Sequence, residues 1–180
     1  AFAKKWHDVT LRCGKEADVV AVDWGQPVTA EVVDQALATG KYDAMTLIHN
    51  ETSTGVMSPL AEIAAVMRRY ADVSFIVDTV SSMSAVPLDL DSLGTDVCLA
   101  GVQKAFGLPP GLAVFAVSDK ALEKAAATPG RGYYFDFVEF AKMDEKHNTP
   151  STPCLSQIFA LDHQLDKMFA EGLENRYRRH

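Results

Sequence analysis

The chain has 180 residues, of which 48% are apolar and 23% are charged, a balance typical of a folded globular domain and not of a disordered or fibrous chain. Seventeen Lys and Arg stand against 24 Asp and Glu, so the net charge is −7, and no basic block interrupts the sequence. This charge argues against nucleic acid or an anionic membrane surface as a partner. No apolar run reaches the roughly 18 residues of a membrane helix and no leader-like pattern opens the chain, so we expect a cytoplasmic protein.

The first third of the chain predicts a helix, a strand and a second helix. Residues 2–13 carry apolar side chains at spacings of three and four and are followed by Gly14, which predicts a helix with a glycine stop. Residues 17–24, ADVVAVDW, form a short β-branched run that predicts a strand. Thr29 is placed to cap the next helix, which we expect to end before Gly40.

The middle of the chain continues the alternation of strands and helices. A strand is predicted over residues 44–50, and Ser58 followed by Pro59 predicts a helix that Ser58 caps and that runs to about Tyr70. Three further short apolar runs predict strands at 74–78, 96–101 and 112–118. Strands that are apolar on both faces and alternate with helices indicate an α/β fold, with a mostly parallel sheet and helices on both faces.

The last third of the chain is predicted to be helical, with two irregular segments. A helix begins near Ser118, a long amphipathic helix begins near Leu155, and LENRYRRH, residues 173–180, opens another helix. The segments 127–137 and 145–153 are rich in Gly, Pro, Ser and Thr, so we expect loops there. Because helical patterns continue to both ends, we expect the chain to be a piece of a longer protein.

The three cysteines do not suggest a metal centre. Cys13, Cys98 and Cys154 are far apart and belong to no CxxC pair or cluster of His and Cys. We therefore expect free thiols and no metal site.

Polar stretches follow three of the predicted strands directly. These are HNETSTG at 49–55, DTVSS at 78–82 and GVQK at 101–104. In an open α/β sheet, ligands bind at the carboxyl ends of the strands, so we expect these side chains to meet at one rim.

Each polar residue has an ordinary structural explanation when it is considered alone. His49 beside an apolar run is expected to be a hydrogen-bonded interior histidine, Asp78 could cap a turn, and Lys104 could extend its ammonium group into water. Together they match the groups that pyridoxal phosphate needs: a lysine that forms a Schiff base and an acid that pairs with the pyridine nitrogen. Lys104 would then act as general base and acid, and Asp78 would keep the ring nitrogen protonated.

Four longer stretches carry a resemblance to a known family. HNETSTGVMSPL, FIVDTVSSMSAVPLDL, GVQKAFGLPPGLAVFAVS and EGLENRYRRH resemble class V aminotransferases, in the branch of alanine–glyoxylate and serine–glyoxylate (serine–pyruvate) enzymes. The resemblance runs over essentially the whole chain. It implies a fold type I large domain, pyridoxal 5'-phosphate as cofactor, a homodimer, and amino transfer from a small amino acid, alanine or serine, to glyoxylate or pyruvate.

The resemblance also implies roles for individual residues. Lys104 matches the lysine that binds the cofactor, and Gln103 matches a glutamine that hydrogen-bonds its phosphate. Asp78 matches the acid at the ring nitrogen, and Val80 packs against the ring face. Thr52 stands where the family has Ser or Thr near the phenolic oxygen of the cofactor.

Two more threonines imply a site shared between subunits. In NTPSTP, Thr152 and, more weakly, Thr149 match a loop that reaches the cofactor phosphate of the neighbouring subunit. Residues 1–180 would then form part of the cofactor-binding large domain, with the glycine-rich phosphate segment upstream. From about residue 172 the chain would lead to a small domain, where the arginine that binds the substrate carboxylate is expected.

Other functions remain open at this point. A 2-aminoethylphosphonate–pyruvate transaminase shares the HxET pattern, although the VQK triplet argues against it. Another class V enzyme with the same cofactor is a further alternative, and a non-catalytic domain could keep the fold. A cysteine desulfurase is disfavoured because Gln103 stands where those enzymes have a histidine. A dinucleotide-binding domain is disfavoured because no GxGxxG follows a strand.

Overall fold

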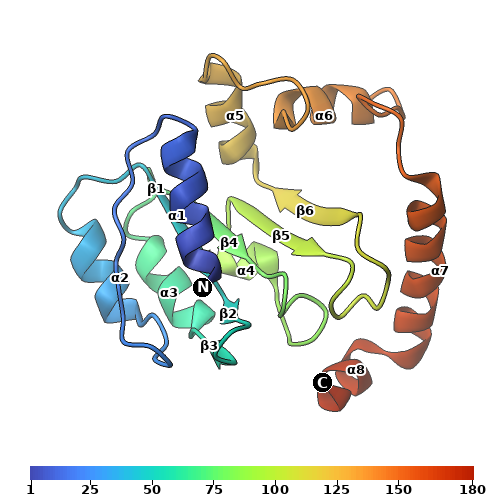
Figure 1. Ribbon diagram of the computed structural model, residues 1–180, viewed down its shortest axis with the longest axis horizontal. Helices are drawn as coiled ribbons and strands as arrows, with labels where there is room; N and C mark the ends of the chain where they lie inside the picture. Colours follow the sequence, from blue (N-terminus) through green and yellow to red (C-terminus); the bar gives the residue numbers. More distant parts are fainter.

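A four-stranded sheet forms the centre of the computed structural model, which describes residues 1–180 (Figure 1). The strand order is β1-β4-β5-β6, where β1 and β4 pair in parallel, β4 and β5 pair in parallel, and β5 and β6 pair antiparallel. A separate two-stranded ribbon, β2-β3, follows β1. The strands are β1 (Ala44–Ile48), β2 (Asn50–Glu51), β3 (Val56–Met57), β4 (Ser74–Asp78), β5 (Val97–Gly101) and β6 (Ala113–Val117). The expectation of a mostly parallel sheet is confirmed.

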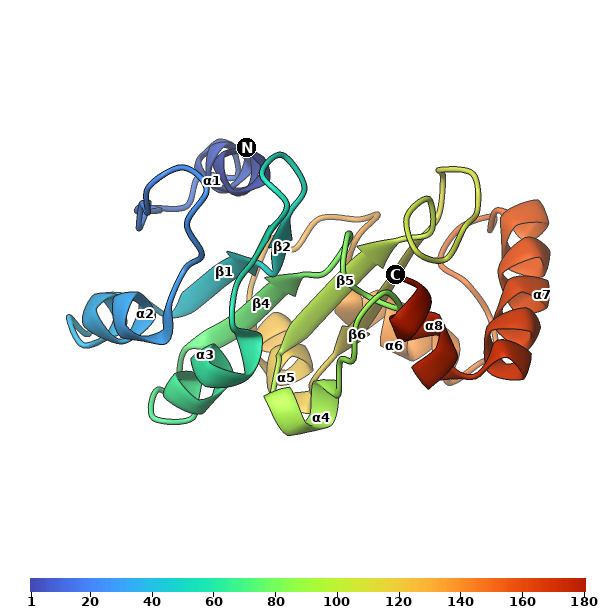
Figure 2. The same cartoon turned by 90° about the horizontal axis from the view of Figure 1, so that it is seen from below.

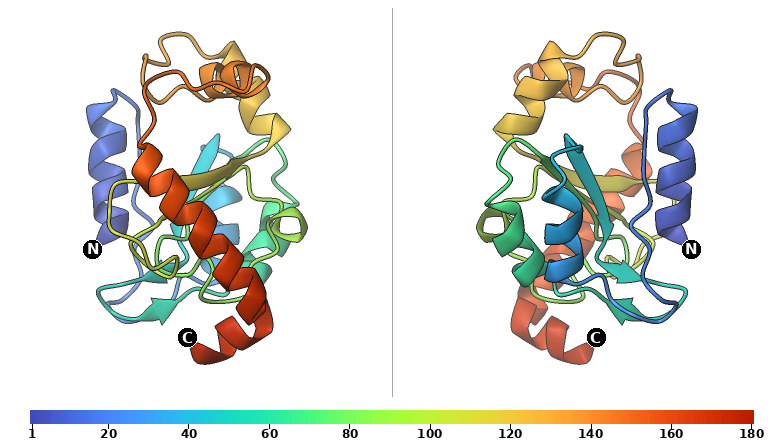
Figure 3. Two further views of the ribbon diagram at one scale, coloured as in Figure 1. Left: turned by 90° about the vertical axis from the view of Figure 1, so that its right-hand side faces the viewer. Right: turned by 90° about the vertical axis from the view of Figure 1, so that its left-hand side faces the viewer.

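Helices lie on both faces of this sheet, as the sequence predicts. Figures 2 and 3 show α1 on one face, with α2, α3 and the short α4 on the opposite face. The long helix α7 lies beyond the β6 side of the sheet and leads into α8 (Figure 1). The helices are α1 (Phe2–Arg12), α2 (Ala30–Leu37), α3 (Leu60–Met67), α4 (Leu90–Leu93), α5 (Asp119–Ala127), α6 (Phe137–Asp144), α7 (Leu155–Glu171) and α8 (Leu173–Arg179). None of these helices is long and apolar enough to span a membrane.

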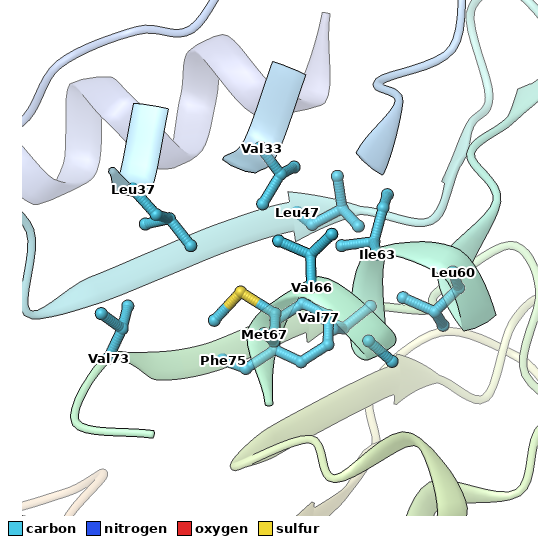
Figure 4. Packing of buried hydrophobic residues seen from close by; sticks show 11 residues of the cluster. Val33, Leu37, Leu47, Leu60, Ile63, Val66, Met67, Val73, Phe75 and Val77 are labelled. Carbon is cyan, nitrogen blue, oxygen red and sulfur yellow. The ribbon is translucent and has the colours of Figure 1, made fainter. Parts of the chain in front are cut away.

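The main core lies between the sheet and helices α2 and α3 (Figure 4). In β4 the side chains alternate, so Phe75 and Val77 are buried in this core while Ile76 and Asp78 lie on the other face. From the helices, Val33 and Ile63 pack onto the same cluster. Each Å² of apolar surface that is buried contributes about 25 cal/mol to stability. This cluster is therefore the main source of stability for the strands that carry the polar rim.

The predicted strand over 17–24 is wrong, because those residues form no sheet ladder. A strand needs a neighbour to which its backbone N–H and C=O groups can bond. The sheet ends at β1 on this side, so no such neighbour is present. Val19 and Val20 are 62% and 46% exposed, which indicates that the β-branched pattern is not buried within this chain.

The capping role predicted for Ser58 is also wrong. Helix α3 begins after Pro59 with no side-chain cap. Ser58 is buried, and its hydroxyl accepts a hydrogen bond from the Val28 N–H at 3.2 Å, across the chain. Tertiary contact has therefore replaced the local cap. The cap predicted for Thr29 is confirmed, since its hydroxyl accepts from the Val32 N–H.

Two short helices were not predicted from the apolar pattern. Helix α4 spans a single turn, with Asp89 accepting from the Ser92 N–H and Gly94 closing the helix in a left-handed conformation. Helix α6 begins at Asp136, whose carboxylate accepts from the Val138 N–H. In both cases a capping aspartate marks the helix start more clearly than hydrophobic periodicity does.

An ion pair at the amino end of the sheet joins three elements. Asp96 is 4% exposed and accepts hydrogen bonds from the Phe75 N–H, the Ser118 hydroxyl and the Lys120 ammonium at 2.7–2.8 Å. Burial would raise the pKa of Asp96, but these donors outweigh burial and hold its pKa below its ordinary value. A hollow of about 350 Å³ opens beside Asp96 and Lys120, at the end of the sheet opposite the polar rim.

A buried arginine joins helix α8 to the loops that follow β4 and β5. Arg176 is 3% exposed, and its Nε donates to the carbonyl oxygen and the hydroxyl of Ser84 at 3.0 and 2.7 Å. Its Nη2 donates to the carbonyl oxygen of Ala105. Ser84 has φ of 69°, a left-handed conformation that is unusual for serine and that the two bonds from Arg176 help to hold.

We expect Asp96→Asn to lower the free energy of unfolding by about 2 kcal/mol at pH 7, because the substitution removes a buried carboxylate that three donors satisfy. A lowered folded-state pKa stabilises the fold above the ordinary value of 3.8, and this contribution disappears as the pH falls through the folded pKa. Denaturant unfolding between pH 3 and pH 7 measures both effects. The difference between wild type and variant should shrink below about pH 4, whereas the exposed control Asp72→Asn should leave stability nearly unchanged.

We expect Arg176→Met to lower the free energy of unfolding by roughly 3 kcal/mol, because it leaves the carbonyl groups of Ser84 and Ala105 without their donor. Arg178→Met is the matched control, since Arg178 is exposed on the same helix and makes no hydrogen bond or ion pair. Denaturant unfolding of the two variants checks this. Equal losses in both would mean that the buried contacts of Arg176 contribute nothing.

Candidate functional site

The predicted polar rim forms at the carboxyl ends of β1, β4 and β5. These three strands are parallel neighbours, so the loops that follow them lie at one edge of the sheet. The hydroxyls of Thr52, after β2, and Ser81, after β4, are 2.6 Å apart. The rim thus joins two loops that are separated by 29 residues in sequence.

Asp78 is the last residue of β4 and is held by two N–H donors. One carboxylate oxygen, Oδ1, accepts from the Val80 backbone N–H at 2.9 Å. The other, Oδ2, accepts from the indole N–H of Trp6 at 3.1 Å. The alternation along β4 places Asp78 on the face that α1 covers, opposite the main core. The carboxylate therefore has a defined orientation in a half-buried position.

The backbone beneath Asp78 is fixed to β5 by Thr79, whose exposed fraction is 0%. Both the N–H and the hydroxyl of Thr79 donate to the carbonyl oxygen of Leu99, at 2.9 and 2.8 Å. The Thr79 hydroxyl also lies 3.3 Å from the thiol of Cys98, and burial raises the pKa of that thiol. Cys98 is therefore a protonated core thiol and not a nucleophile.

His49 lies inside the protein below the rim, which confirms the interior role expected for it. It is buried, and its Nδ1 lies 2.9 Å from the hydroxyl of Ser82. Burial lowers the pKa of His49, so the ring is neutral at physiological pH. Its backbone is also in the network, since the His49 N–H donates to the Asp78 carbonyl oxygen.

The loop after β5 presents Gln103 and Lys104 to solvent. The Gln103 side chain folds back over Gly101, where an added Cβ would lie 2.4 Å from Gln103 Oε1. A glycine is therefore required at position 101 for this arrangement. The Lys104 carbonyl oxygen accepts from the N–H of Gly107, which closes a tight turn. Lys104 is exposed, and its ammonium makes no hydrogen bond or ion pair within the chain.

Thr149 and Thr152 do not join this rim. Both are exposed on the loop between α6 and α7, and the Thr149 hydroxyl donates to the Ser151 carbonyl oxygen at 2.8 Å. The loop leads into the N-terminal end of α7, whereas α8 follows the C-terminal end of that helix (Figure 1). Within one chain, the structure therefore places Thr52, Asp78, Val80, Gln103 and Lys104 in loops at the same edge of the sheet, but not Thr149 and Thr152.

The arrangement offers three kinds of chemistry at one edge. Lys104 supplies a free primary amine, Asp78 supplies an oriented carboxylate, and Thr52 with Ser81 supplies a hydroxyl pair. An amine can bind an aldehyde, and a carboxylate can pair with a protonated ring nitrogen. Hydroxyl groups can bond oxygen atoms of a ligand.

Sequence reasoning missed two residues that shape this site. Trp6 fits the apolar pattern of its helix, and nothing in the sequence relates it to Asp78, 72 residues away. Arg176 belongs to a helix end rich in arginine, so its burial is not visible in the local pattern. For Ser81 the signal was present in the quoted VSS stretch, directly after the strand.

Comparison with known proteins gives a consistent result along the chain. Residues 1–179 match the family described as Aminotransferase class-V. An uncharacterised aminotransferase of Methanocaldococcus jannaschii is 39% identical over 99% of this chain and 47% of its own length. A serine–glyoxylate aminotransferase of Arabidopsis thaliana is 34% identical over 99% of this chain and 46% of its own.

The structural comparison leads to the same family. The crystal structure of an alanine–glyoxylate aminotransferase from Nostoc sp. superimposes with a TM-score of 0.93 at 29% identity, over 99% of this chain and 48% of that one. The chain spans about half the length of the curated relatives it matches. The family match over nearly all residues and the agreement in fold show that this chain belongs to the class V aminotransferase family.

Proposed function

We propose that the protein is a pyridoxal 5'-phosphate-dependent aminotransferase that moves the amino group of a small amino acid, alanine or serine, to glyoxylate or pyruvate. The observation that carries the proposal is the unpaired amine of Lys104 on the same rim as the oriented carboxylate of Asp78. Family membership supports the reaction class, and the names of the Arabidopsis and Nostoc relatives support the substrate class.

The residues present fit this cofactor. The Asp78 carboxylate has two bound donors and keeps lone pairs that can accept from a pyridinium N–H. Val80 lies in the turn directly after β4, where its N–H donates to Asp78, and its side chain would contact the ring. Thr52 would bond the phenolic oxygen, and Gln103 would bond the phosphate. When bound, the cofactor supplies an electron sink for the substrate Cα–H bond.

Lys104 has the mobile role in this proposal. Its Nζ would hold the aldehyde group of the cofactor and, once released, would act as the base and acid that moves a proton at the substrate Cα. A side chain without a fixed partner in the chain suits both roles. Asp78, held by two donors, would keep the ring nitrogen protonated.

We infer that residues 1–180 are part of the cofactor-binding large domain of a cytoplasmic homodimer. The glycine-rich phosphate segment would precede this part, and a small domain carrying the carboxylate-binding arginine would follow from about residue 172. Thr152, with a lesser part for Thr149, would donate to the cofactor phosphate of the neighbouring subunit. Their exposed position away from the rim of their own chain is compatible with that role.

We expect Lys104→Ala to abolish amino transfer and the covalent attachment of the cofactor. The full-length protein is incubated with pyridoxal 5'-phosphate and reduced with borohydride, and the labelled peptide is mapped by mass spectrometry. Wild type should carry one label, at Lys104. Lys41→Ala is the control, because Lys41 is an exposed lysine without a bonding partner at the opposite end of the sheet. Labels scattered over surface lysines, or transfer retained in Lys104→Ala, would refute the proposal.

Substrate assays then separate the candidate reactions. Alanine and serine are compared as donors, with glyoxylate and pyruvate as acceptors. Transfer from 2-aminoethylphosphonate at a higher kcat/KM than from either amino acid would favour the phosphonate transaminase instead. Lack of transfer from every donor, with label still at Lys104, would favour another reaction of the class V family.

We expect Thr152→Val to weaken retention of the cofactor in the subunit opposite the substituted one, because the hydroxyl donor is lost across the interface. The expected loss is about tenfold to a hundredfold in affinity, the equivalent of about one hydrogen bond to a charged group. Mixed dimers of one Thr152→Val chain and one Lys104→Ala chain distinguish the two arrangements. If Thr152 binds the phosphate of the partner's site, the Thr152→Val chain keeps the only site with Lys104 and binds the cofactor there with normal affinity. A weakened affinity at that site would refute the shared arrangement.

A further inference from the structure

We propose that Trp6 is a positioning residue, whose indole N–H orients the Asp78 carboxylate toward the ring nitrogen of the bound cofactor. The inference rests on the proposed function. Trp6 lies in helix α1, outside the three polar stretches that form the rim. The observation that carries the inference is the 3.1 Å contact between Trp6 Nε1 and Asp78 Oδ2.

Helix α1 is held so that Trp6 faces Asp78. At its first turn the Phe2 N–H donates to Glu51 Oε2 at 3.0 Å, which ties the helix to the ribbon that carries Thr52. One turn later His7 Nε2 lies 3.2 Å from the Ala17 carbonyl oxygen, which ties the helix to the segment after it. The indole of Trp6 is half-buried between these attachments.

The chemistry of the two donors restricts what the carboxylate can do. An indole nitrogen only donates, and so does a backbone N–H, so both bonds require an accepting oxygen on Asp78. The Val80 N–H fixes Oδ1 and the Trp6 indole fixes Oδ2, which together prevent rotation of the carboxylate about its Cβ–Cγ bond. With the backbone at Thr79 fixed to β5, the remaining lone pairs have a constant direction.

A constant direction matters because the bond to a ring nitrogen depends on alignment. A carboxylate that rotates freely loses conformational entropy when the cofactor binds, whereas one already held by two donors loses less. Trp6→Phe keeps an aromatic ring on α1 and removes the N–H donor together with one ring of the indole. We therefore expect this variant to bind pyridoxal 5'-phosphate about tenfold more weakly.

The first measurement tests the contact without cofactor. Full-length protein is prepared with isotope-labelled tryptophan, and the Trp6 indole N–H resonance is assigned by its loss in Trp6→Phe. Asp78→Ala should shift this resonance upfield and expose the N–H to faster exchange with water. The resonance of Trp24, which is 73% exposed, should not move. An unmoved Trp6 resonance would overturn the inference whatever the enzyme's activity.

The second measurement is a double-mutant cycle on cofactor affinity. The Kd for pyridoxal 5'-phosphate is measured by absorbance titration in wild type, Trp6→Phe, Asp78→Ala and the double variant, with Trp24→Phe as the matched control. If Trp6 acts through Asp78, Trp6→Phe weakens binding in wild type and has no further effect in Asp78→Ala. Equal weakening in both backgrounds, or none in wild type, would refute the positioning role. Failure of wild type itself to bind the cofactor would refute the proposed function instead.

Discussion

The parallel pairing of β4 with its two neighbours is the constraint on which the site depends. Because β1, β4 and β5 run in the same direction, three loops from distant parts of the sequence are brought to one edge. Thr79 secures this edge by donating two hydrogen bonds to the Leu99 carbonyl oxygen. The core of apolar side chains beneath β4 keeps the strand in register, so that the alternation of its side chains determines which residues face away from the core.

The two groups that the proposed function pairs, Asp78 and Lys104, have opposite surroundings. Asp78 is fixed by donors from two elements, while Lys104 has no partner in the chain. This difference follows from their positions, since Asp78 ends a strand and Lys104 lies in an exposed turn beyond one. In the proposed reaction Asp78 has to hold one proton and benefits from rigidity, whereas Lys104 has to move between two atoms and benefits from freedom.

Much of this arrangement could be predicted from sequence because it depends on local signals. The apolar runs at 74–78 and 96–101 predict strands, and the polar stretches directly after them predict the rim. The strand predicted at 17–24 was wrong because pairing depends on a neighbour that a local pattern cannot reveal. Trp6 and Arg176 were missed for the same physical reason, since their contacts join segments 72 and more than 70 residues apart.

The contacts of Arg176 have a consequence for the order of folding. They join α8 to Ser84 and Ala105 over 92 and 71 residues, so they close two of the longest loops in the chain. Long loops cost more entropy to close, and such contacts tend to form after the local ones. During synthesis from the N-terminus the sheet and the locally bonded turn at Lys104 can therefore assemble first. The bond from Arg176 to the carbonyl oxygen of Ala105, the residue after Lys104, is added only when residue 176 has left the ribosome.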